Sequence, residues 1–381
     1  MNEITLNHKV FPLSGLVDQP DTIPWATLSP YETHVLNFCR QWLGRQAMFT
    51  LRTSGSTGDP KSISITRRHM QISARLTGQA LNLQPGDKAL VCLSTEYIAG
   101  LMMLVRGFVL GLQLTVIDPT SRPLQDFSAE SRFDFTAMVP LQLQNCLSEA
   151  TEAPDKRAIL NGMRAIILGG APVSVPLAEQ LQQITAPIYH TYGMTETVTH
   201  IALRRLNGPQ VSDYFTPLPG VNLGVDERGC LTIRADVTDN QTVITNDLVE
   251  LRPDGRFKWL GRVDHTINSG GVKVQIEKVE AALEVLFYIY RGASLAERRF
   301  FVGALDHPQL GQEVVAVVEG EPFSAATKIE IYAKMRRMLN KYEIPRAYYF
   351  LKKFDETPTG KIDRISNLRR CALLTPTQFN L

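Results

Sequence analysis

Nine consecutive residues, Thr53 to Lys61 (TSGSTGDPK), combine small hydroxyl side chains with two glycines and a closing Pro-Lys pair. Such residues let backbone N–H groups gather around an anion, so the run predicts a phosphate-binding loop. The loop of common nucleoside triphosphatases needs Gly-Lys followed directly by Ser or Thr, whereas Lys61 follows Pro60. A surface turn of the same composition is the alternative. The predicted phosphate contacts are Thr53, Ser54, Gly55, Ser56, Thr57, Gly58 and Lys61.

A second polar run, YHTYGMTET (189–197), carries Thr195 and Glu196. The Thr195 hydroxyl can bind phosphate, and the Glu196 carboxylate is the kind of oxygen ligand that Mg²⁺ takes beside phosphate oxygens and water. Upstream, the turn at Gly169, Gly170 and Ala171 leaves space for a planar base against its backbone. The alternative for both runs is purely structural, a strand that ends in a glycine turn with Glu196 solvated.

Three charged residues extend this pattern toward the C-terminus. Asp247 ends a predicted strand, where its carboxylate could bind both hydroxyls of a ribose, and Arg262 follows it. Lys361 lies in the turn-rich run ETPTGKIDR, and a solvated surface charge is its alternative interpretation. Each motif alone is more often structural, but they occur together in one order over about 310 positions. That order favours one nucleotide-dependent reaction.

The ordered set resembles the motifs of the AMP-forming adenylating enzymes, which include acyl- and aryl-CoA synthetases, peptide-synthetase adenylation domains and luciferases. The resemblance extends from Thr53 to Arg364. The runs EYIAGLMMLVRG, YGMTETVTHIALR, TNDLVEL and GRVDHTINSGGVK are most similar to the o-succinylbenzoate–CoA ligases of menaquinone biosynthesis. This implies conversion of o-succinylbenzoate, ATP and CoA to o-succinylbenzoyl-CoA, AMP and diphosphate through an acyl-adenylate. The alternatives are a ligase for another aryl or acyl acid, a carrier-protein acceptor, or a non-catalytic nucleotide-binding descendant.

The resemblance also implies a role for each matched residue. The loop at 53–61 would hold the β- and γ-phosphates of ATP, and Lys361 would bridge the substrate carboxylate and the α-phosphate. Asp264 would be the hinge about which a small C-terminal domain rotates between two half-reactions. The remaining roles are an adenine shelf at Gly169, Gly170 and Ala171; base stacking at Tyr192, beside Gly193 and Met194; phosphate binding by Thr195; Mg²⁺ ligation by Glu196; ribose binding by Asp247 and Arg262; and a CoA-facing loop at Gly270 and Gly271.

Recognition of the acid is predicted from Arg106, which stands among apolar residues in LMMLVRGFVLG (101–111). A buried guanidinium needs an anionic partner. The o-succinylbenzoate ligases carry an arginine in this helix, so the resemblance implies that Arg106 binds the second carboxylate of the substrate. A structural ion pair with a neighbouring carboxylate is the alternative. Thr199 and His200 are further candidates for the acid pocket.

Two departures from the family concern this pocket. Tyr97 stands where many members carry a histidine that lines the acid. The phosphate loop begins near residue 53, so much of the family's usual N-terminal subdomain is expected to be trimmed. We therefore expect a pocket wall that is either thinner or supplied by a second copy of the chain, which leaves a homo-oligomer open.

The composition sets limits on partners and location. The chain has 381 residues and a formal net charge of +2, which gives no support for nucleic acid or an anionic membrane as the main partner. Five scattered cysteines without a CxxC pair favour a reducing cytoplasm over a disulfide framework or a zinc site. The N-terminus does not have the pattern of a signal peptide. Arg106 and three glycines interrupt the most apolar run, which argues against membrane insertion.

The elements that must position these residues are predicted to be α/β. Short β-rich runs at 88–94, 112–118, 135–140 and 163–168 alternate with helical patterns, which is typical of largely parallel sheets. Shorter alternating strands follow from about Val221, and a helical run is expected at 274–286. We predict the adenylating-enzyme fold, with a large domain of packed α/β subdomains over 1–263 that binds ATP and the acid, and a small mobile α+β domain over 264–381.

Overall fold

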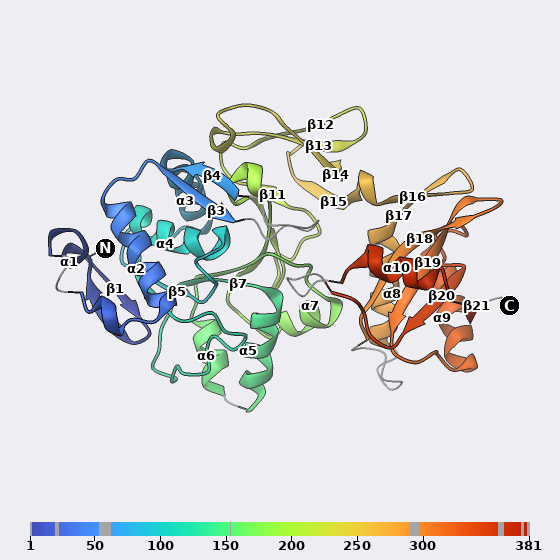
Figure 1. The fold of residues 1–381 in the computed structure, drawn as a ribbon, viewed down its shortest axis with the longest axis horizontal. Coiled ribbons are helices and arrows are strands. Elements are labelled where there is room, and N and C mark those ends of the chain that lie inside the picture. Colours follow the sequence, from blue (N-terminus) through green and yellow to red (C-terminus); the bar gives the residue numbers. More distant parts are fainter. Residues whose placement is uncertain are drawn as a thin grey trace. The chain divides into compact units, whose positions relative to one another are not determined.

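A computed structural model describes residues 2–19, 23–52, 62–152, 154–289, 298–356, 362–374 and 377–378. The chain divides into two compact units (Figure 1). The first unit comprises Met1–Gly224, Thr232–Val243 and Leu251–Phe257, and the second comprises Val225–Leu231, Ile244–Glu250 and Lys258–Leu381. The predicted domain boundary and hinge at Asp264 stay predictions.

A nine-stranded sheet forms the centre of the first unit, in the order β11-β10-β9-β8-β7-β5-β6-β1-β2. The strands from β9 through β8, β7, β5 and β6 to β1 pair in parallel, whereas β10, β11 and β2 add antiparallel edges. The largely parallel α/β prediction is therefore confirmed. The strands are β1 (Glu3–Leu6), β2 (Lys9–Pro12), β5 (Lys88–Val91), β6 (Gln113–Val116), β7 (Phe135–Met138), β8 (Ala165–Leu168), β9 (Ile188–Gly193), β10 (His200–Arg205) and β11 (Thr216–Pro217).

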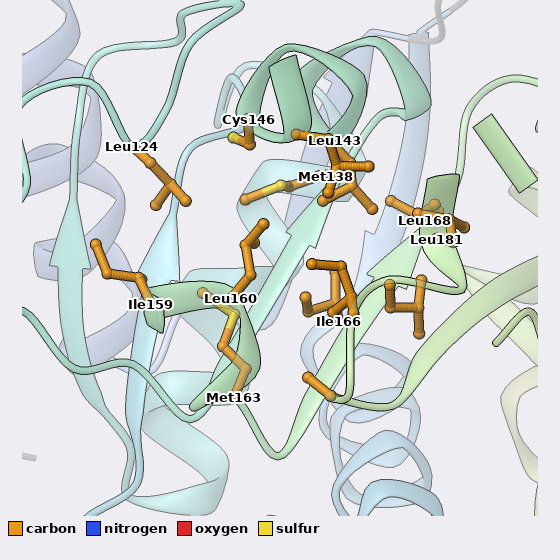
Figure 2. Close-up of a cluster of buried hydrophobic side chains, with 14 of the residues drawn as sticks. Leu124, Met138, Leu143, Cys146, Ile159, Leu160, Met163, Ile166, Leu168 and Leu181 are labelled. Atoms are coloured by element: carbon orange, nitrogen blue, oxygen red, sulfur yellow. The ribbon is translucent and has the colours of Figure 1, made fainter. Parts of the chain in front are cut away.

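Helices cover this sheet because its central strands are apolar on both faces. Leu90, Ile166 and Leu168 belong to a buried cluster that α5 (Pro140–Glu152), α6 (Pro154–Asn161) and α7 (Val175–Leu181) complete. Figure 2 shows Ile166 and Leu168 within it. The alternate positions of the same strands are also buried, and α4 (Ile98–Leu110) packs on β5, β6 and β7. α3 (Arg67–Leu81) packs in turn on α4. These two helices bring their polar residues to the start of β10.

The remaining elements of the first unit are short or peripheral. A separate two-stranded sheet pairs β3 (Met48–Arg52) with β4 (Ser62–Thr66) on either side of residues 53–61. α2 (Pro30–Leu43) begins with a capping box between Ser29 and Glu32. The others are α1 (Leu13–Asp18) and the 3₁₀ turns η2 (Trp25–Thr27), η3 (Thr195–Thr197) and η4 (Asp236–Thr238).

A four-stranded sheet has the strand order β12-β13-β14-β15: β12 (Asn222–Val225), β13 (Cys230–Arg234), β14 (Val243–Leu251) and β15 (Phe257–Arg262). The second unit also contains a six-stranded sheet with its own apolar core. Its elements are η5 (Val263–His265), β16 (Thr266–Ser269), β17 (Val272–Gln275), α8 (Ile276–Ile289), β18 (Phe300–His307), β19 (Gly311–Glu319), α9 (Ala325–Met338), β20 (Ala347–Leu351), α10 (Arg364–Cys371) and β21 (Thr377–Gln378).

Most predicted elements are present, but some bounds differ. The expected helix at 274–286 begins at Ile276, because Val274 and Gln275 pair with β16 as part of β17. The helix around Arg106 ends at Leu110 and is capped by Gly111, which adopts the left-handed conformation that glycine tolerates best. Among the described residues, no helix is both long enough and apolar enough to span a bilayer.

Candidate active site

The turn after β8 has a bare backbone surface. A Cβ atom at Gly169 would lie 2.6 Å from Oγ1 of Thr191, whose hydroxyl donates to the Leu168 carbonyl over 2.9 Å. Gly170 has a φ of +80°, which favours glycine. Both glycines are therefore required by the local packing and conformation. The turn therefore presents bare backbone at the strand end, and the adenine shelf predicted there stays a prediction.

His190 lies directly beneath this turn on β9. Its ring hydrogen-bonds the Ala171 backbone on one side and meets the Arg204 guanidinium, with 3.3 Å between Nδ1 and the Arg204 nitrogen, on the other. Burial, and secondarily the Arg204 charge, lowers the pKa of His190 to about 4. The imidazole is therefore neutral near pH 7 and can accept from Arg204 while donating to the Ala171 carbonyl. Tyr192 is packed against Phe215 and Phe257, at ring distances of 5.7 and 5.0 Å.

The Thr195-Glu196 pair sits in a rigid turn. The Thr197 hydroxyl, which is fully buried, accepts from the Met194 N–H over 3.0 Å and lies 2.8 Å from the Thr199 carbonyl oxygen. A Cβ at Gly193 would come within 2.3 Å of that same carbonyl oxygen, so only glycine fits there. Thr195 and Glu196 are exposed as a consequence, which makes both available to a ligand.

Thr195 and Glu196 line a cleft of about 390 Å³ in the first unit. Its wall includes β4, His69 and Asp239; Nε2 of His69 lies 2.9 Å from the Asp239 carboxylate, which also pairs with Arg68. Among the described residues, no group of three or more His, Cys, Asp or Glu side chains is arranged to hold a metal ion. Glu196 presents an exposed carboxylate to this cleft, and its predicted role as a Mg²⁺ ligand stays a prediction.

Arg106 lies at the junction of α3, α4 and β10. Its side chain is 2 % exposed, and its Nε atom has no hydrogen-bond partner among the described residues. Another nitrogen of the guanidinium donates to Sδ of Met103 over 3.5 Å. Burial alone lowers the pKa of Arg106 to about 10, with no carboxylate among the described residues to raise it. The structural ion pair considered from the sequence is thus absent from this part of the chain.

The His200 imidazole is close enough to this guanidinium to feel its charge. The Arg106 charge and burial together lower the pKa of His200 to about 3, burial being the larger cause. Nε2 of His200 lies 3.3 Å from the Thr77 hydroxyl, and the Thr199 and Ser73 hydroxyls lie 2.6 Å apart. His200 thus lies near Arg106, and Thr199 precedes His200 in the chain; their predicted role in binding the acid stays a prediction. Tyr97 stands at the N-cap of α4 and is 44 % exposed.

Asp247 and Arg262 form a second polar group, in the second unit. Oδ1 of Asp247 accepts from the Trp259 indole N–H over 3.2 Å and lies 3.7 Å from an Arg262 nitrogen. Arg262 also makes two hydrogen bonds to Asp264, of 2.9 and 2.7 Å, which raise the pKa of the guanidinium. Asp247 is buried, whereas Trp259 is 37 % exposed. The two residues predicted to bind ribose are therefore brought together.

The remaining predicted residues are the two glycines expected to face CoA, the phosphate loop and Lys361. Gly270 and Gly271 form the β16–β17 turn with φ values of +59° and +80°. The phosphate loop Thr53–Lys61 and Lys361 lie outside the described residues, so their predicted roles stay predictions.

Residues 33–232 match the AMP-binding enzyme family. The chain belongs to this family. A probable 2-succinylbenzoate–CoA ligase of Mycobacterium tuberculosis is 30% identical over 343 residues, which span 84% of this chain and 83% of that protein. The chain is therefore an ATP-dependent enzyme of the AMP-forming ligase superfamily, as predicted from its motifs.

Solved structures agree with this assignment. An AMP-forming acyl-CoA synthetase/AMP-acid ligase II-like protein from Dyadobacter fermentans is 42% identical, with a TM-score of 0.60, and the match covers 91% of this chain and 97% of that one. The o-succinylbenzoate CoA synthetase of Bacillus subtilis, in complex with its acyl-adenylate, has a TM-score of 0.68 at 22% identity, covering 87% and 70% of the two chains. The latter likeness shows the adenylating-enzyme fold alone.

Sequence reasoning missed three polar side chains that contact or lie beside predicted site residues. His190 supports the Gly-Gly-Ala turn, His69 lines the Thr195-Glu196 cleft, and Trp259 donates to Asp247. His190 lies within the quoted run 189–197, but His69 stands eight residues after the phosphate loop, where no motif marks it. Their partners come from other elements, and only the fold reveals them.

Proposed function

We propose that this enzyme activates o-succinylbenzoate and transfers it to CoA, and that Arg106 binds the carboxylate that does not react. The observation that carries the proposal is the buried Arg106 guanidinium, which has no carboxylate partner among the described residues. A lone buried cation is strongly disfavoured unless an anion compensates it. A dicarboxylic acid supplies such an anion, whereas a simple aryl or fatty acid has no carboxylate to spare. The names of the relatives, 2-succinylbenzoate–CoA ligases, support the same substrate.

The neighbours of Arg106 suit this ligand. His200 is neutral because its pKa is about 3, so it adds no second positive charge and can hydrogen-bond a carboxylate or the substrate ketone. The Thr199 and Ser73 hydroxyls, which lie 2.6 Å apart, can each donate to an acceptor of this kind. This group of side chains combines one fixed charge with neutral donors, which would suit a keto-diacid better than a hydrocarbon chain.

For the nucleotide, we propose the roles inferred from the motifs. The Gly169–Ala171 turn and Tyr192–Met194 would hold the base, Asp247 and Arg262 the ribose, and Thr195 with the 53–61 loop the phosphates. Mg²⁺ would be held by Glu196 and the phosphates, and it would offset charge on the phosphoryl oxygens. Gly270 and Gly271 would face CoA. The five cysteines are free and buried, which suits a reducing compartment, and we infer the cytoplasm.

The reaction would proceed in two steps. A carboxylate oxygen of the acid attacks the α-phosphorus of ATP, which forms the acyl-adenylate and releases diphosphate. The CoA thiol then attacks the acyl carbon, gives up its proton and displaces AMP. Lys361 would stabilise the first transition state, and rotation about Asp264 would withdraw it before the second.

Acid-dependent exchange between ATP and diphosphate tests the substrate. We expect o-succinylbenzoate to support exchange far better than benzoate, cinnamate or a fatty acid, and the thioester to form when CoA is added. A better response to a monocarboxylic acid would reject the proposed substrate but leave the ligase assignment intact. Lys361→Ala should abolish exchange in protein that still binds ATP.

Arg106→Leu tests the role of the guanidinium. A charge-assisted hydrogen bond contributes about 1.5–3 kcal/mol, so we expect kcat/KM for the diacid to fall roughly 10- to 100-fold. The activity with an analogue that lacks the second carboxylate should change little. Arg68→Leu is the matched control, because Arg68 is exposed and paired with Asp239. Equal losses for diacid and analogue would remove Arg106 from carboxylate recognition.

A further inference from the structure

One ionisable side chain of the Thr195-Glu196 cleft has no role in the proposed function. The cleft holds about 390 Å³, which lies within the usual range of ligand pockets, about 300–1,000 Å³. Glu196 and Asp239 are acidic, and the other described residues that line it are neutral except for His69. His69 is therefore the only described side chain of this lining that can carry a positive charge. An anion in the cleft would need that charge.

His69 is fixed both through its backbone and through its ring. It lies in the first turn of α3, where its N–H donates to the Thr66 hydroxyl over 3.2 Å. Its Nε2 atom lies 2.9 Å from Oδ1 of Asp239, and 18 % of its side chain is exposed. None of the hydrogen bonds among the described residues uses its Nδ1 atom. The ring is thus oriented, with one nitrogen left for a ligand.

Asp239, which also lines the cleft, is held by a turn of its own. It follows η4 with a φ of +50°, and Asn240 continues the left-handed backbone with a φ of +58°. The Asn240 side chain donates to the Asp236 carboxylate over 2.9 Å, and Arg68 contacts Oδ1 of Asp239 at 2.6 Å. The hydrogen bond from His69 is the largest cause of the lowered pKa of Asp239. The carboxylate is therefore charged near pH 7 and can hold the imidazole.

This arrangement can present a protonated imidazole to a phosphate. A ring with protons on both nitrogens donates through Nε2 to Asp239 and keeps an N–H at Nδ1. Together with Arg68 and Asp239, such a ring gives the group a net positive charge. A charge-assisted N–H is among the stronger donors that a phosphate oxygen can meet. The exposed Thr195 hydroxyl on the same lining supplies a second donor.

We propose that His69 binds the diphosphate that leaves during adenylation, and that Asp239 positions its ring. This rests on the proposed function, in which Thr195 binds the phosphates. As the carboxylate oxygen of the acid bonds to the α-phosphorus, the bond from that phosphorus to the bridging oxygen breaks, and the diphosphate takes the electron pair. A protonated His69 offsets part of the charge that develops there. The second step releases no diphosphate, so His69 has no part in it.

Exchange between ATP and labelled diphosphate, supported by any acid that the enzyme activates, tests this contact. We expect His69→Ala to raise the KM for diphosphate roughly 10- to 100-fold, the loss of one charge-assisted hydrogen bond. The KM for the acid should change less than about 3-fold, and so should the rate of thioester formation from supplied acyl-adenylate and CoA. Asp239→Asn should raise the KM for diphosphate about 3- to 10-fold, because the amide still accepts from the ring but carries no charge. It carries the test alone if His69→Ala does not fold.

His265→Ala is the matched control, because it breaks a second histidine–carboxylate contact, of 2.8 Å to Glu277, in the second unit. It should leave the KM for diphosphate unchanged. An unchanged KM for diphosphate in both cleft variants would overturn the proposal, and so would an equal loss in thioester formation. If another acid replaces o-succinylbenzoate in supporting exchange, the proposed substrate is wrong, and the same comparison with that acid still decides the role of His69. Failure of every acid to support exchange would reject the proposed function and this inference with it.

Discussion

Arg106 and Arg262 are both predicted to face substrate, yet their surroundings are opposite. Arg106 is buried among apolar residues, and burial lowers its pKa to about 10. Arg262 is partly exposed between two carboxylates, and its hydrogen bonds to Asp264 raise its pKa. One arginine lacks an anion within the described chain, whereas the other has two.

The difference separates a charge held for a ligand from a charge held by the protein. A guanidinium that is paired with Asp264 and Asp247 is already compensated, so a ligand can add only part of a contact. A guanidinium without a carboxylate gains most of its electrostatic stabilisation when an anion binds. We therefore expect Arg106 to control substrate choice and Arg262 to orient Asp247.

The largest expected effect comes from Arg106→Met. Replacing a buried ionic group by an apolar one of similar volume is often stabilising, by about 1–4 kcal/mol. We expect the free energy of unfolding of the unliganded enzyme to rise, and stabilisation by the diacid to disappear. Denaturant unfolding with and without o-succinylbenzoate measures both. A less stable unliganded variant would show that Arg106 already has a compensating partner in the protein.

Acid should destabilise the first unit through its buried imidazoles. The pKa values of His200 and His190 are about 3 and about 4 in the folded protein, against about 6.5 when unfolded. The unfolded chain therefore binds more protons below pH 6.5, so this stability is complete above that pH and is lost as the pH falls toward the folded values. At pH 5 each histidine accounts for a loss of about 2 kcal/mol.

His200→Gln should make the decline in stability between pH 6.5 and 4 less steep, as followed by denaturant unfolding at each pH. Arg106→Met should do so as well, to a smaller extent, because removing the neighbouring charge raises the pKa of His200. If neither substitution alters the dependence of the unfolding free energy on pH, His200 does not cause the loss of stability in acid.

At the second arginine, Trp259→Phe removes one hydrogen bond to Asp247 and keeps most of the ring. A bond of this kind contributes about 1 kcal/mol, so the KM for ATP should rise about 5-fold. The discrimination between ATP and its 2′-deoxy and 3′-deoxy analogues should weaken, because the carboxylate is less well oriented. Trp25→Phe is the control substitution. Normal discrimination in Trp259→Phe would mean that the indole does not orient Asp247.

The two arginines also show which features of the site can be predicted from the sequence alone. The apolar run around Arg106 indicates a buried helix with an isolated charge, and Gly-Gly-Ala after a strand indicates a bare turn. Both features are local in the chain. The pairs His190–Arg204, His69–Asp239 and Trp259–Asp247 join different elements, and nothing in a single sequence links their members. Likewise, the first two residues of the predicted helix belong to β17 instead, because they pair with β16. Local helix propensity does not include such pairing with another strand.

Asp264→Asn should have the smallest effect, although it removes the strongest contact of Arg262. Exposed ion pairs contribute about 0–1 kcal/mol, and both side chains of this pair are partly exposed. We expect the free energy of unfolding to change by less than about 1 kcal/mol. The affinity for ATP should also change little, because Arg262 keeps its pair with Asp247. If Asp264 is the hinge, its effect should appear in the step that follows adenylation. An unchanged rate of adenylate formation with slower thioester formation would support that role. If the variant and the unmodified enzyme have the same rates in both steps, Asp264 is only part of a surface ion pair.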